Sequence, residues 1–229
     1  MRYAALKRML PRPLARYLLH VEASLEDAVA AFAVQLPDGA RVLDAGAGEG
    51  AYAAHFRRQR YCGVDLAIGD ADWNYTGLDA VGDLARLPFR SGAFDACINI
   101  VTLEHVRAPG VVLAELARVL KPGGFLLLAV PHEWEVHQSP HDYFRYTRHG
   151  VEYLLGEAGF AIGEVRPMGG YFRLLSRRLL NGLQFFPGVW KLAAALFLVP
   201  PALILPCFDS LDRERNFTLG YICTARSHS

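Results

Sequence analysis

Three glycines stand at every second position of one short loop, at Gly46, Gly48 and Gly50. Glycine has no Cβ, so the backbone can turn sharply there and approach a ligand closely. Asp44 precedes the first glycine by two residues, and Asp65 follows about 20 residues later at the end of an expected strand. An ionised carboxylate only accepts hydrogen bonds, which suits Asp65 to a pair of ribose hydroxyls. The loop therefore indicates a site for a cofactor that contains a nucleoside.

Two classes of cofactor fit this loop. With Ala51 in the last position it matches the dinucleotide pattern G-x-G-x-x-[GA], which predicts an NAD(P)-dependent oxidoreductase of Rossmann type. The second class is a cofactor that carries an ammonium group and a sulfonium group. Asp44 favours this class, because a carboxylate is favourable beside these two cations and unfavourable beside a pyrophosphate. A tight turn with a helix-capping acid, which binds nothing, is the structural alternative.

Histidines and acids follow two apolar segments, residues 94–100 and 125–130. Near neutral pH a histidine is the natural general base for an acceptor that must lose a proton. We expect His105 and His141 to be the catalytic pair, and the alternative for each is a hydrogen-bonded structural histidine. No metal site is expected, because the later cluster matches no zinc spacing and contains Pro140. The residues of the two clusters are Glu104, His105, His132, Glu133, His137, His141 and Asp142.

The apolar pattern predicts the elements that hold these residues in place. Apolar residues at three- and four-residue spacing predict a helix over residues 14–35. Strands then alternate with helices, which predicts an α/β fold with a doubly wound, mostly parallel sheet, helices on both faces and ligands beyond the carboxyl ends of the strands. The expected strands are 41–44, 61–65, 80–82, 94–100, 125–130, 160–167 and 218–225, and the expected helices after the first are 51–58, 111–120 and 151–158.

The composition indicates the broad class of protein. A chain of 229 residues with 52% hydrophobic content and a net charge of +1 predicts one globular domain, and it argues against a nucleic-acid partner bound by neutralising phosphates. The four cysteines are widely spaced, and three lie in apolar runs, which predicts a reducing, cytoplasmic compartment. The basic start of the chain is broken by prolines and arginines, so a secretory signal is not expected. Its basic residues are Arg2, Lys7, Arg8, Arg12 and Arg16.

Five segments, in order along the chain, resemble motifs of the class I S-adenosylmethionine-dependent methyltransferases, in their type 11-like bacterial form. The resemblance is best over residues 40–165. It implies a seven-stranded sheet of order 3-2-1-4-5-7-6 with strand 7 antiparallel, and S-adenosyl-L-methionine as cofactor. The segments are Val42-Leu43-Asp44-Ala45-Gly46-Ala47-Gly48-Glu49-Gly50, Gly63-Val64-Asp65-Leu66, residues 82–89, residues 94–106, and residues 116–124 with Leu120-Lys121-Pro122-Gly123-Gly124.

The resemblance also implies roles for individual residues. Asp44 and the three glycines would lie along the methionine and ribose of the cofactor. Asp65, followed by Leu66, would bind the ribose hydroxyls. The remaining contacts would come from Asp83 and Leu84 at the adenine, from Asn99 at the methionine portion, and from His105 near the methyl group. Residues 137–147 are similar to a segment of one bacterial subgroup, and we expect either a substrate cover or a packed loop there.

An apolar segment, residues 188–206, is the largest departure from a minimal family domain. It holds one charge, Lys191, and as an unbroken helix it would nearly span a bilayer, but Pro200 and Pro201 are expected to break it. Two alternatives remain: a buried helix or homodimer contact, and an apolar hairpin on the membrane surface. Arg173, Arg177, Arg178 and Lys191, with the basic N-terminus, would attract anionic lipids.

Together these patterns predict a single methyltransferase domain over residues 1–229. Its parts are an N-terminal helical segment (1–38), a cofactor-binding core (39–170), an apolar helical insertion (171–215) and a last strand with its tail (216–229). The expected reaction is O-methylation of a small-molecule or lipid-linked acceptor, in the cytoplasm or at the membrane face. The alternatives are the NAD(P)-dependent oxidoreductase and a non-catalytic cofactor-binding module.

Overall fold

The computed structural model describes residues 11–69 and 72–228, and Arg2, Lys7 and Arg8 of the basic N-terminus lie outside them. The chain divides into two compact units. The larger consists of Leu25–Arg166 with Tyr221–Ser229, and the smaller of Met1–Ser24 with Pro167–Gly220. Each unit is described by itself below.

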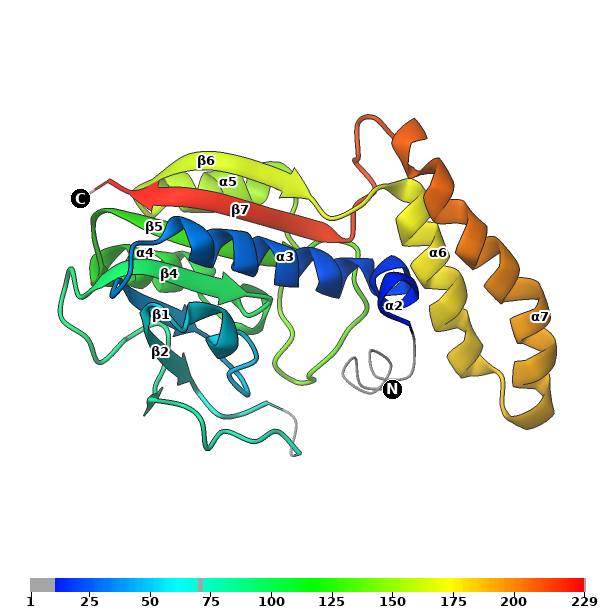
Figure 1. The fold of residues 1–229 in the computed structure, drawn as a ribbon, viewed down its shortest axis with the longest axis horizontal. Helices are drawn as coiled ribbons and strands as arrows, with labels where there is room; N and C mark the ends of the chain where they lie inside the picture. The colour runs from blue at the N-terminus through cyan, green and yellow to red at the C-terminus, as the bar shows by residue number, and fades with distance from the viewer. Residues whose placement is uncertain (1–10, 70–71, 229) are drawn as a thin grey trace. The chain divides into compact units, whose positions relative to one another are not determined.

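One seven-stranded sheet has the strand order β3-β2-β1-β4-β5-β7-β6, as predicted. The pairs β1–β2, β2–β3, β1–β4 and β4–β5 are parallel, and the arrow of β7 in Figure 1 runs opposite to that of β4. The predicted α/β class, strand order and antiparallel strand 7 are confirmed. The strands are β1 (Arg41–Ala45), β2 (Arg60–Asp65), β3 (Ala80–Val81), β4 (Phe94–Ile100), β5 (Leu120–Pro131), β6 (Phe160–Pro167) and β7 (Gly220–Ser227).

The central strands form the core because their side chains are apolar on both faces. Leu43 of β1, Ile98 of β4 and Leu127 of β5 are almost completely buried. A strand covered on both faces has a continuous apolar run rather than an alternating pattern, as β5 does over residues 125–130; β4 is buried almost throughout but includes the polar Asn99. Parallel strands of this kind end at one edge of the sheet, so the loops that follow β1, β2 and β4 are neighbours.

Helices flank the sheet on both sides. Figure 1 shows α3 (His20–Gln35) in front of the strands and α4 (Pro109–Val119) and α5 (Arg148–Glu157) behind them. Phe32 of α3 packs edge-on against Phe125 of β5, with ring centroids 6.5 Å apart. The single helix predicted over residues 14–35 is wrong in one detail, because the backbone leaves helical geometry at Leu19, which separates α2 (Arg12–Leu18) from α3.

The α-helix predicted over residues 51–58 is also wrong. The structure has only a 3-10 turn, η1 (Ala53–Phe56), because Ala53 and His55 donate to residues three positions earlier. Phe56 is buried and stacks on Tyr61 of β2 with ring centroids 5.9 Å apart, which holds this turn against the sheet. The glycine loop therefore leads into a short turn rather than into a long helix.

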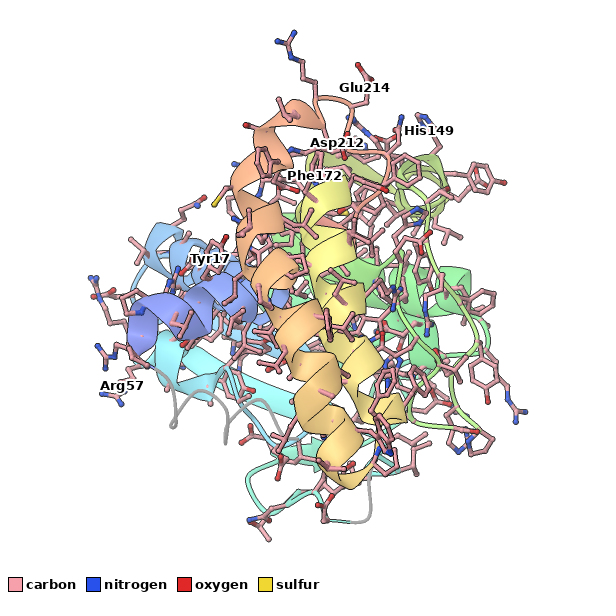
Figure 2. The ribbon with its side chains drawn as sticks, turned by 90° about the vertical axis from the view of Figure 1, so that its right-hand side faces the viewer. Tyr17, Arg57, His149, Phe172, Asp212 and Glu214 are labelled. Carbon is pink, nitrogen blue, oxygen red and sulfur yellow. The ribbon has the colours of Figure 1, made fainter. Side chains whose placement is uncertain are left out.

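The smaller unit contains a hairpin of two helices. Figures 1 and 2 show α6 (Tyr171–Gly182), which carries Phe172, and α7 (Gly188–Ile204) side by side, joined by η3 (Leu183–Phe185). The predicted break at Pro200 and Pro201 is wrong, because α7 runs through both prolines. Proline has no N–H, so the carbonyls of Leu196 and Phe197, four residues earlier, lose their intrahelical donors while the helical geometry continues.

A buried hydroxyl compensates for another proline at the end of α7. The carbonyl of Ala202 would accept from the N–H four residues on, but Pro206 has none. Ser176 of α6 donates to this carbonyl at 2.5 Å, and both residues are buried. In η4 (Leu205–Leu211), Asp209 accepts from the backbone N–H groups of Gly170 and Arg173 and so caps the N-terminus of α6. These contacts fix the hairpin's geometry.

Candidate active site

The glycine loop closes against the adjacent strand and the loop that follows β4. The N–H of Gly46 donates to the carbonyl of Val64 at 2.8 Å, which joins the start of the loop to β2. Gly46 has a φ of +88°, and a Cβ at this position would overlap the side chain of Thr102. A glycine is therefore required by both the conformation and the space.

Asp65, at the end of β2, orders the same loop. Its Oδ2 accepts from the N–H of Gly48 at 3.0 Å, and its Oδ1 accepts from the N–H of Ala67 at 2.8 Å. Each carboxylate oxygen has a further lone pair, so Asp65 can still accept two hydroxyl donors. Leu66, the next residue, is exposed beside it. The arrangement suits the predicted ribose contact.

Asp44 is a buried carboxyl at the end of β1. Tyr61 donates a hydrogen bond of 2.6 Å to its Oδ2. Burial raises the pKa of Asp44 to about 7, the hydrogen bond from Tyr61 lowers it, and the negative charge of Asp65 raises it. A nearby cation would favour its ionised form, as the ammonium group of an amino-acid-containing cofactor would.

Asn99, on β4 beside β1, is completely buried. Its Nδ2 donates to the carbonyl of Ala45 at 2.7 Å, whereas its Oδ1 has no hydrogen-bond partner within residues 11–69 and 72–228. A buried amide oxygen without a donor is uncommon and needs an explanation. An ammonium group bound near Asp44 and the glycine loop would supply that donor, so the site residues fit S-adenosylmethionine.

The side chains of the two residues predicted at the adenine, Asp83 and Leu84, make contacts within the protein. Asp83 is exposed, and its Oδ1 accepts from the N–H of Ala85 at 2.8 Å. Leu84 is 5% exposed and belongs to the main core, so its side chain supports the sheet. Contact from Leu84 to a cofactor would therefore come from its backbone.

Two residues that contact the glycine loop, Trp73 and Asn74, were not predicted from the sequence. Glu49 accepts from the N–H of Asn74 at 2.9 Å, and a Cβ on Gly48 would lie 3.1 Å from the ring of Trp73. Trp73 therefore lies directly against the loop. It follows β2 outside any motif, so its spacing carries no signal of this contact.

A second group of polar side chains follows β4, where Glu104 and His105 form part of η2 (Leu103–His105). Nε2 of His105 lies 3.7 Å from Oε1 of Glu104, and Nε2 of His137 lies 3.9 Å from the same oxygen. Burial raises the pKa of Glu104 to about 8 and lowers the pKa of His105. We call Glu104, His105 and His137 the acceptor-side cluster. Thr102, which contacts Gly46, connects it to the glycine loop.

His141 contacts this cluster through its backbone. Its carbonyl accepts from Nδ1 of His105 at 2.6 Å, while its imidazole is 3.3 Å from the hydroxyl of Tyr143. The structure thus brings the two predicted catalytic histidines together, through the imidazole of His105 and the backbone carbonyl of His141. His132 instead has its Nδ1 2.9 Å from the carbonyl of Tyr146 and packs against Tyr221.

The loop after β5 is held together by an ion pair. Arg145 binds both carboxylate oxygens of Asp142 at 2.6 and 2.7 Å, and it donates to the carbonyls of Trp134 and Glu135. The hydrogen bonds from Arg145 lower the pKa of Asp142 to about 2. These contacts agree with the packed-loop alternative for residues 137–147.

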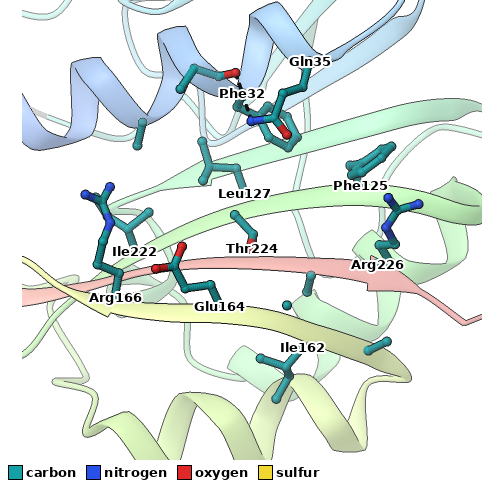
Figure 3. A pocket seen from close by; sticks show the side chains of 15 residues that line it. Phe32, Gln35, Phe125, Leu127, Ile162, Glu164, Arg166, Ile222, Thr224 and Arg226 are labelled. Atoms are coloured by element: carbon teal, nitrogen blue, oxygen red, sulfur yellow. Dashed lines mark hydrogen bonds between the residues drawn. The ribbon is translucent and has the colours of Figure 1, made fainter.

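A cavity of about 520 Å³ in the larger unit lies elsewhere, between α3 and the strands β5, β6 and β7. Figure 3 shows Phe32 and Gln35 from the helix on one side, and Glu164 and Arg166 of β6 on the other. None of the predicted cofactor-binding residues lines it. It forms where the edge strands have little helical cover, and we assign it no part in the site.

Comparison with known proteins identifies the family of the segment that carries the glycine loop. The profile of a methyltransferase domain family matches residues 43–128, which contain the glycine loop, Asp65 and Asn99. The chain contains a methyltransferase domain. S-adenosylmethionine is the cofactor of that family, which the intact glycine loop and acids accommodate. The match favours this domain over the NAD(P)-dependent alternative.

Several curated proteins are similar to the methyltransferase domain. A fatty-acid O-methyltransferase of Mycolicibacterium smegmatis is 38% identical over 100 residues, which cover 39% of this chain and 36% of that protein. A tRNA (carboxymethyluridine(34)-5-O)-methyltransferase of Arabidopsis thaliana is 35% identical over 120 residues, covering 48% of this chain and 28% of that protein. The chain thus spans about a third of the length of these relatives.

Solved structures agree on the fold of the methyltransferase domain. A 1,6-didemethyltoxoflavin-N1-methyltransferase of Burkholderia thailandensis, with bound S-adenosylhomocysteine, superposes with a TM-score of 0.56. The alignment covers 99% of this chain and 89% of that protein at 20% identity. At this identity the similarity shows the shared fold.

Proposed function

We propose that this protein transfers the methyl group of S-adenosylmethionine to an acceptor oxygen. The observation that carries the proposal is the pairing of a buried carboxyl, Asp44, with a donor-lacking amide oxygen, Asn99 Oδ1, beside the glycine loop. Both groups favour a cation that donates hydrogen bonds. The methionine portion of this cofactor supplies one, its ammonium group, whereas a pyrophosphate is an anion. Asp44, Gly46, Gly48, Gly50, Asp65, Leu66, Asp83, Leu84 and Asn99 remain the proposed cofactor-binding residues.

The reaction is an in-line displacement at the methyl carbon. An electron pair of the acceptor oxygen forms the new bond to carbon as the carbon–sulfur bond breaks, and the sulfonium becomes the neutral thioether of S-adenosylhomocysteine. An acceptor hydroxyl must also lose its proton. Holding the three reacting atoms in line supplies much of the acceleration in such a site.

We assign activation of the acceptor hydroxyl to the acceptor-side cluster. His105 contributes the lone pair of its Nε2, because its Nδ1 hydrogen is donated to the carbonyl of His141. His141 is then a positioning residue that acts through its backbone. His105→Gln should therefore lower turnover by about 10²- to 10⁴-fold with unchanged cofactor affinity, whereas His141→Ala, which keeps the carbonyl, should have a small effect.

We propose a small-molecule or lipid-linked acceptor. The similarity to a fatty-acid O-methyltransferase supports a lipid-linked acceptor. A tRNA methyltransferase is also similar, but the net charge of +1 offers little attraction for a polyanion. Large exposed apolar side chains on the α6–α7 hairpin also favour a lipid.

We propose that the hairpin binds the membrane surface from the cytoplasmic side. Within the described residues, the helical stretch Gly188–Leu211 is apolar and long enough to cross a membrane, and an 18-residue window of it has a mean hydropathy of 1.9. The exposed apolar residues near its start are Phe185, Val189, Trp190, Leu192, Leu196 and Phe197. Arg173 and Arg177 pair with Asp209 and Glu22, so this binding rests on apolar contact more than on the charge predicted from sequence.

Two experiments test these proposals. Isothermal titration with S-adenosylhomocysteine and with NAD distinguishes the two cofactor classes, and the proposal requires binding of the first alone. Mass spectrometry of a cell extract incubated with protein and methyl-labelled cofactor then identifies the acceptor. Cofactor binding with no labelled product in any extract fraction would favour the non-catalytic module.

Co-sedimentation with liposomes tests the membrane surface. The protein should pellet with phosphatidylglycerol-containing vesicles, and Trp190→Glu combined with Phe197→Glu should abolish pelleting. Tyr153→Glu, which changes an exposed aromatic residue of α5 outside the hairpin, is the matched control. A wild-type protein that stays in the supernatant as a dimer would instead assign this surface to self-association.

A further inference from the structure

The acceptor-side cluster has the composition of a metal site. One ligand atom from each of Glu104, His105 and His137 lies within 4.8 Å of the others. The imidazole rings of His105 and His137 meet edge to face, with centroids 4.7 Å apart. Two metal–ligand bonds of roughly 2.1 Å span at most roughly 4.2 Å, so the separations of 3.7 and 3.9 Å from Glu104 already fit. A small rotation of one imidazole would bring both nitrogens to one ion.

Glu104 lacks the partners that a buried carboxylate needs. Its side chain is 1% exposed, and neither carboxylate oxygen has a hydrogen-bond partner in the described part of the chain. The nearby guanidinium of Arg145 is already bound to both oxygens of Asp142. A buried carboxylate left in this way is unfavourable unless a cation or a proton compensates it.

The two histidines are oriented to present a free nitrogen to Glu104. A carbonyl can only accept, so the contact of 2.6 Å from the carbonyl of His141 assigns the hydrogen of His105 to Nδ1. The carbonyl of Glu135, 3.1 Å from Nδ1 of His137, assigns that ring the same tautomer, and Arg145 Nη2 is farther away at 3.4 Å. Both Nε2 lone pairs therefore face the carboxylate. Metal-binding histidines are held in this way, with the second nitrogen donating to a carbonyl or carboxylate.

We propose that Glu104, His105 and His137 bind a divalent transition-metal cation, with Zn²⁺ as the best match to two imidazoles and one carboxylate. Sequence spacing predicted no metal, because the set considered there left out Glu104 and His105. Folding brings those two residues, from the loop after β4, against His137 from the loop after β5.

Such an ion would help to activate the acceptor hydroxyl, and this catalytic role rests on the proposed methyltransferase function. Three protein ligands leave coordination positions open, and an acceptor hydroxyl bound there would lose its proton more readily. With its Nε2 lone pair bound to the ion, His105 would act on the acceptor as a metal ligand rather than as a direct base, and the hydroxyl proton would pass to water. The substrate class implied is a hydroxyl-bearing acceptor, because oxygen is the atom that such an ion would bind and polarise.

Metal binding can be measured without any acceptor. Chelator-treated protein is titrated with Zn²⁺ by calorimetry and with Co²⁺ by its visible absorption. We expect one equivalent per chain, with affinity more than about 100-fold lower in Glu104→Gln and in His137→Gln, because the loss of an outer-shell partner alone typically costs about 10- to 100-fold. His149→Gln is the matched control, because His149 is exposed and lies outside the cluster. Circular dichroism melting of each variant confirms that it is folded.

S-adenosylhomocysteine binding, measured on the same samples, separates the two proposals. Cofactor binding with no Co²⁺ spectrum, or with equal Co²⁺ affinity in wild type and both cluster variants, overturns the metal site and leaves the proposed function in place. Co²⁺ binding that depends on the cluster, in a protein that binds no cofactor, supports the metal site and overturns the proposed function.

Discussion

The hydroxyl of Tyr61 donates to the buried carboxyl of Asp44 at 2.6 Å, across the adjacent strands β1 and β2. This bond lowers the pKa of Asp44, and burial, the larger effect, raises it to about 7. The carboxyl is therefore mostly protonated below pH 7 in the cofactor-free protein. Because its folded-state pKa exceeds the unfolded value, this group lowers stability as the pH rises from about 4 to about 7.

The affinity for S-adenosylhomocysteine should depend on this titration. The ligand's ammonium group favours ionised Asp44, so affinity should rise as the pH increases toward 7 and level off above it, by at most about tenfold per pH unit. Tyr61→Phe removes a hydrogen bond that favours ionisation, so the rise should move to higher pH. Calorimetry from about pH 5.5 to about pH 8.5 measures both. An affinity that is flat across this range would separate Asp44 from the ammonium group.

Gly46→Ala and Gly50→Ala should differ sharply. Both glycines have positive φ, +88° and +74°, but a Cβ on Gly46 overlaps Thr102 whereas one on Gly50 meets nothing within 4 Å. Gly50→Ala should cost about 1 kcal/mol of unfolding free energy from strain alone. Gly46→Ala should cost more and should also abolish cofactor binding. Urea denaturation with ligand titration measures both effects, and equal behaviour of the two variants would contradict this account.

Cofactor binding should change the fluorescence of Trp73. The ring lies against Gly48, so a ligand along the glycine loop must contact or displace it. A fluorescence change on adding S-adenosylhomocysteine should disappear in Trp73→Phe and persist in Trp190→Phe. The same change in both variants would point to Trp134 instead.

Ser176→Ala should destabilise the α6–α7 hairpin. The hydroxyl supplies the donor that Pro206 cannot give to the carbonyl of Ala202. Leaving this buried carbonyl unpaired should cost about 1–2 kcal/mol of unfolding free energy. Chemical denaturation measures it, with Ser210→Ala, an exposed serine of η4, as the control. A loss no larger than the control's would show that water replaces the hydroxyl.

Local patterns determined much of the fold and the residues of the proposed cofactor site. The glycines, Asp44 and Asp65 lie within or at the end of consecutive strand–loop segments, so their spacing places them at one edge of a parallel sheet. The strand order was implied by the family resemblance that the five motifs carry. The helix expected at residues 51–58 failed because propensity does not register the tertiary contact of Phe56 with Tyr61 that holds a short turn.

Tertiary structure alone decided which residues form the acceptor-side cluster. Glu104 and His137 are 33 residues apart in the sequence, and only the adjacency of β4 and β5 brings their ligand atoms to 3.9 Å. The contacts between Tyr61 and Asp44, between Trp73 and Gly48, and between the Ser176 hydroxyl and the carbonyl of Ala202 likewise join distant positions. Periodicity and motif spacing report local geometry, whereas contacts between separate loops depend on how the whole core packs.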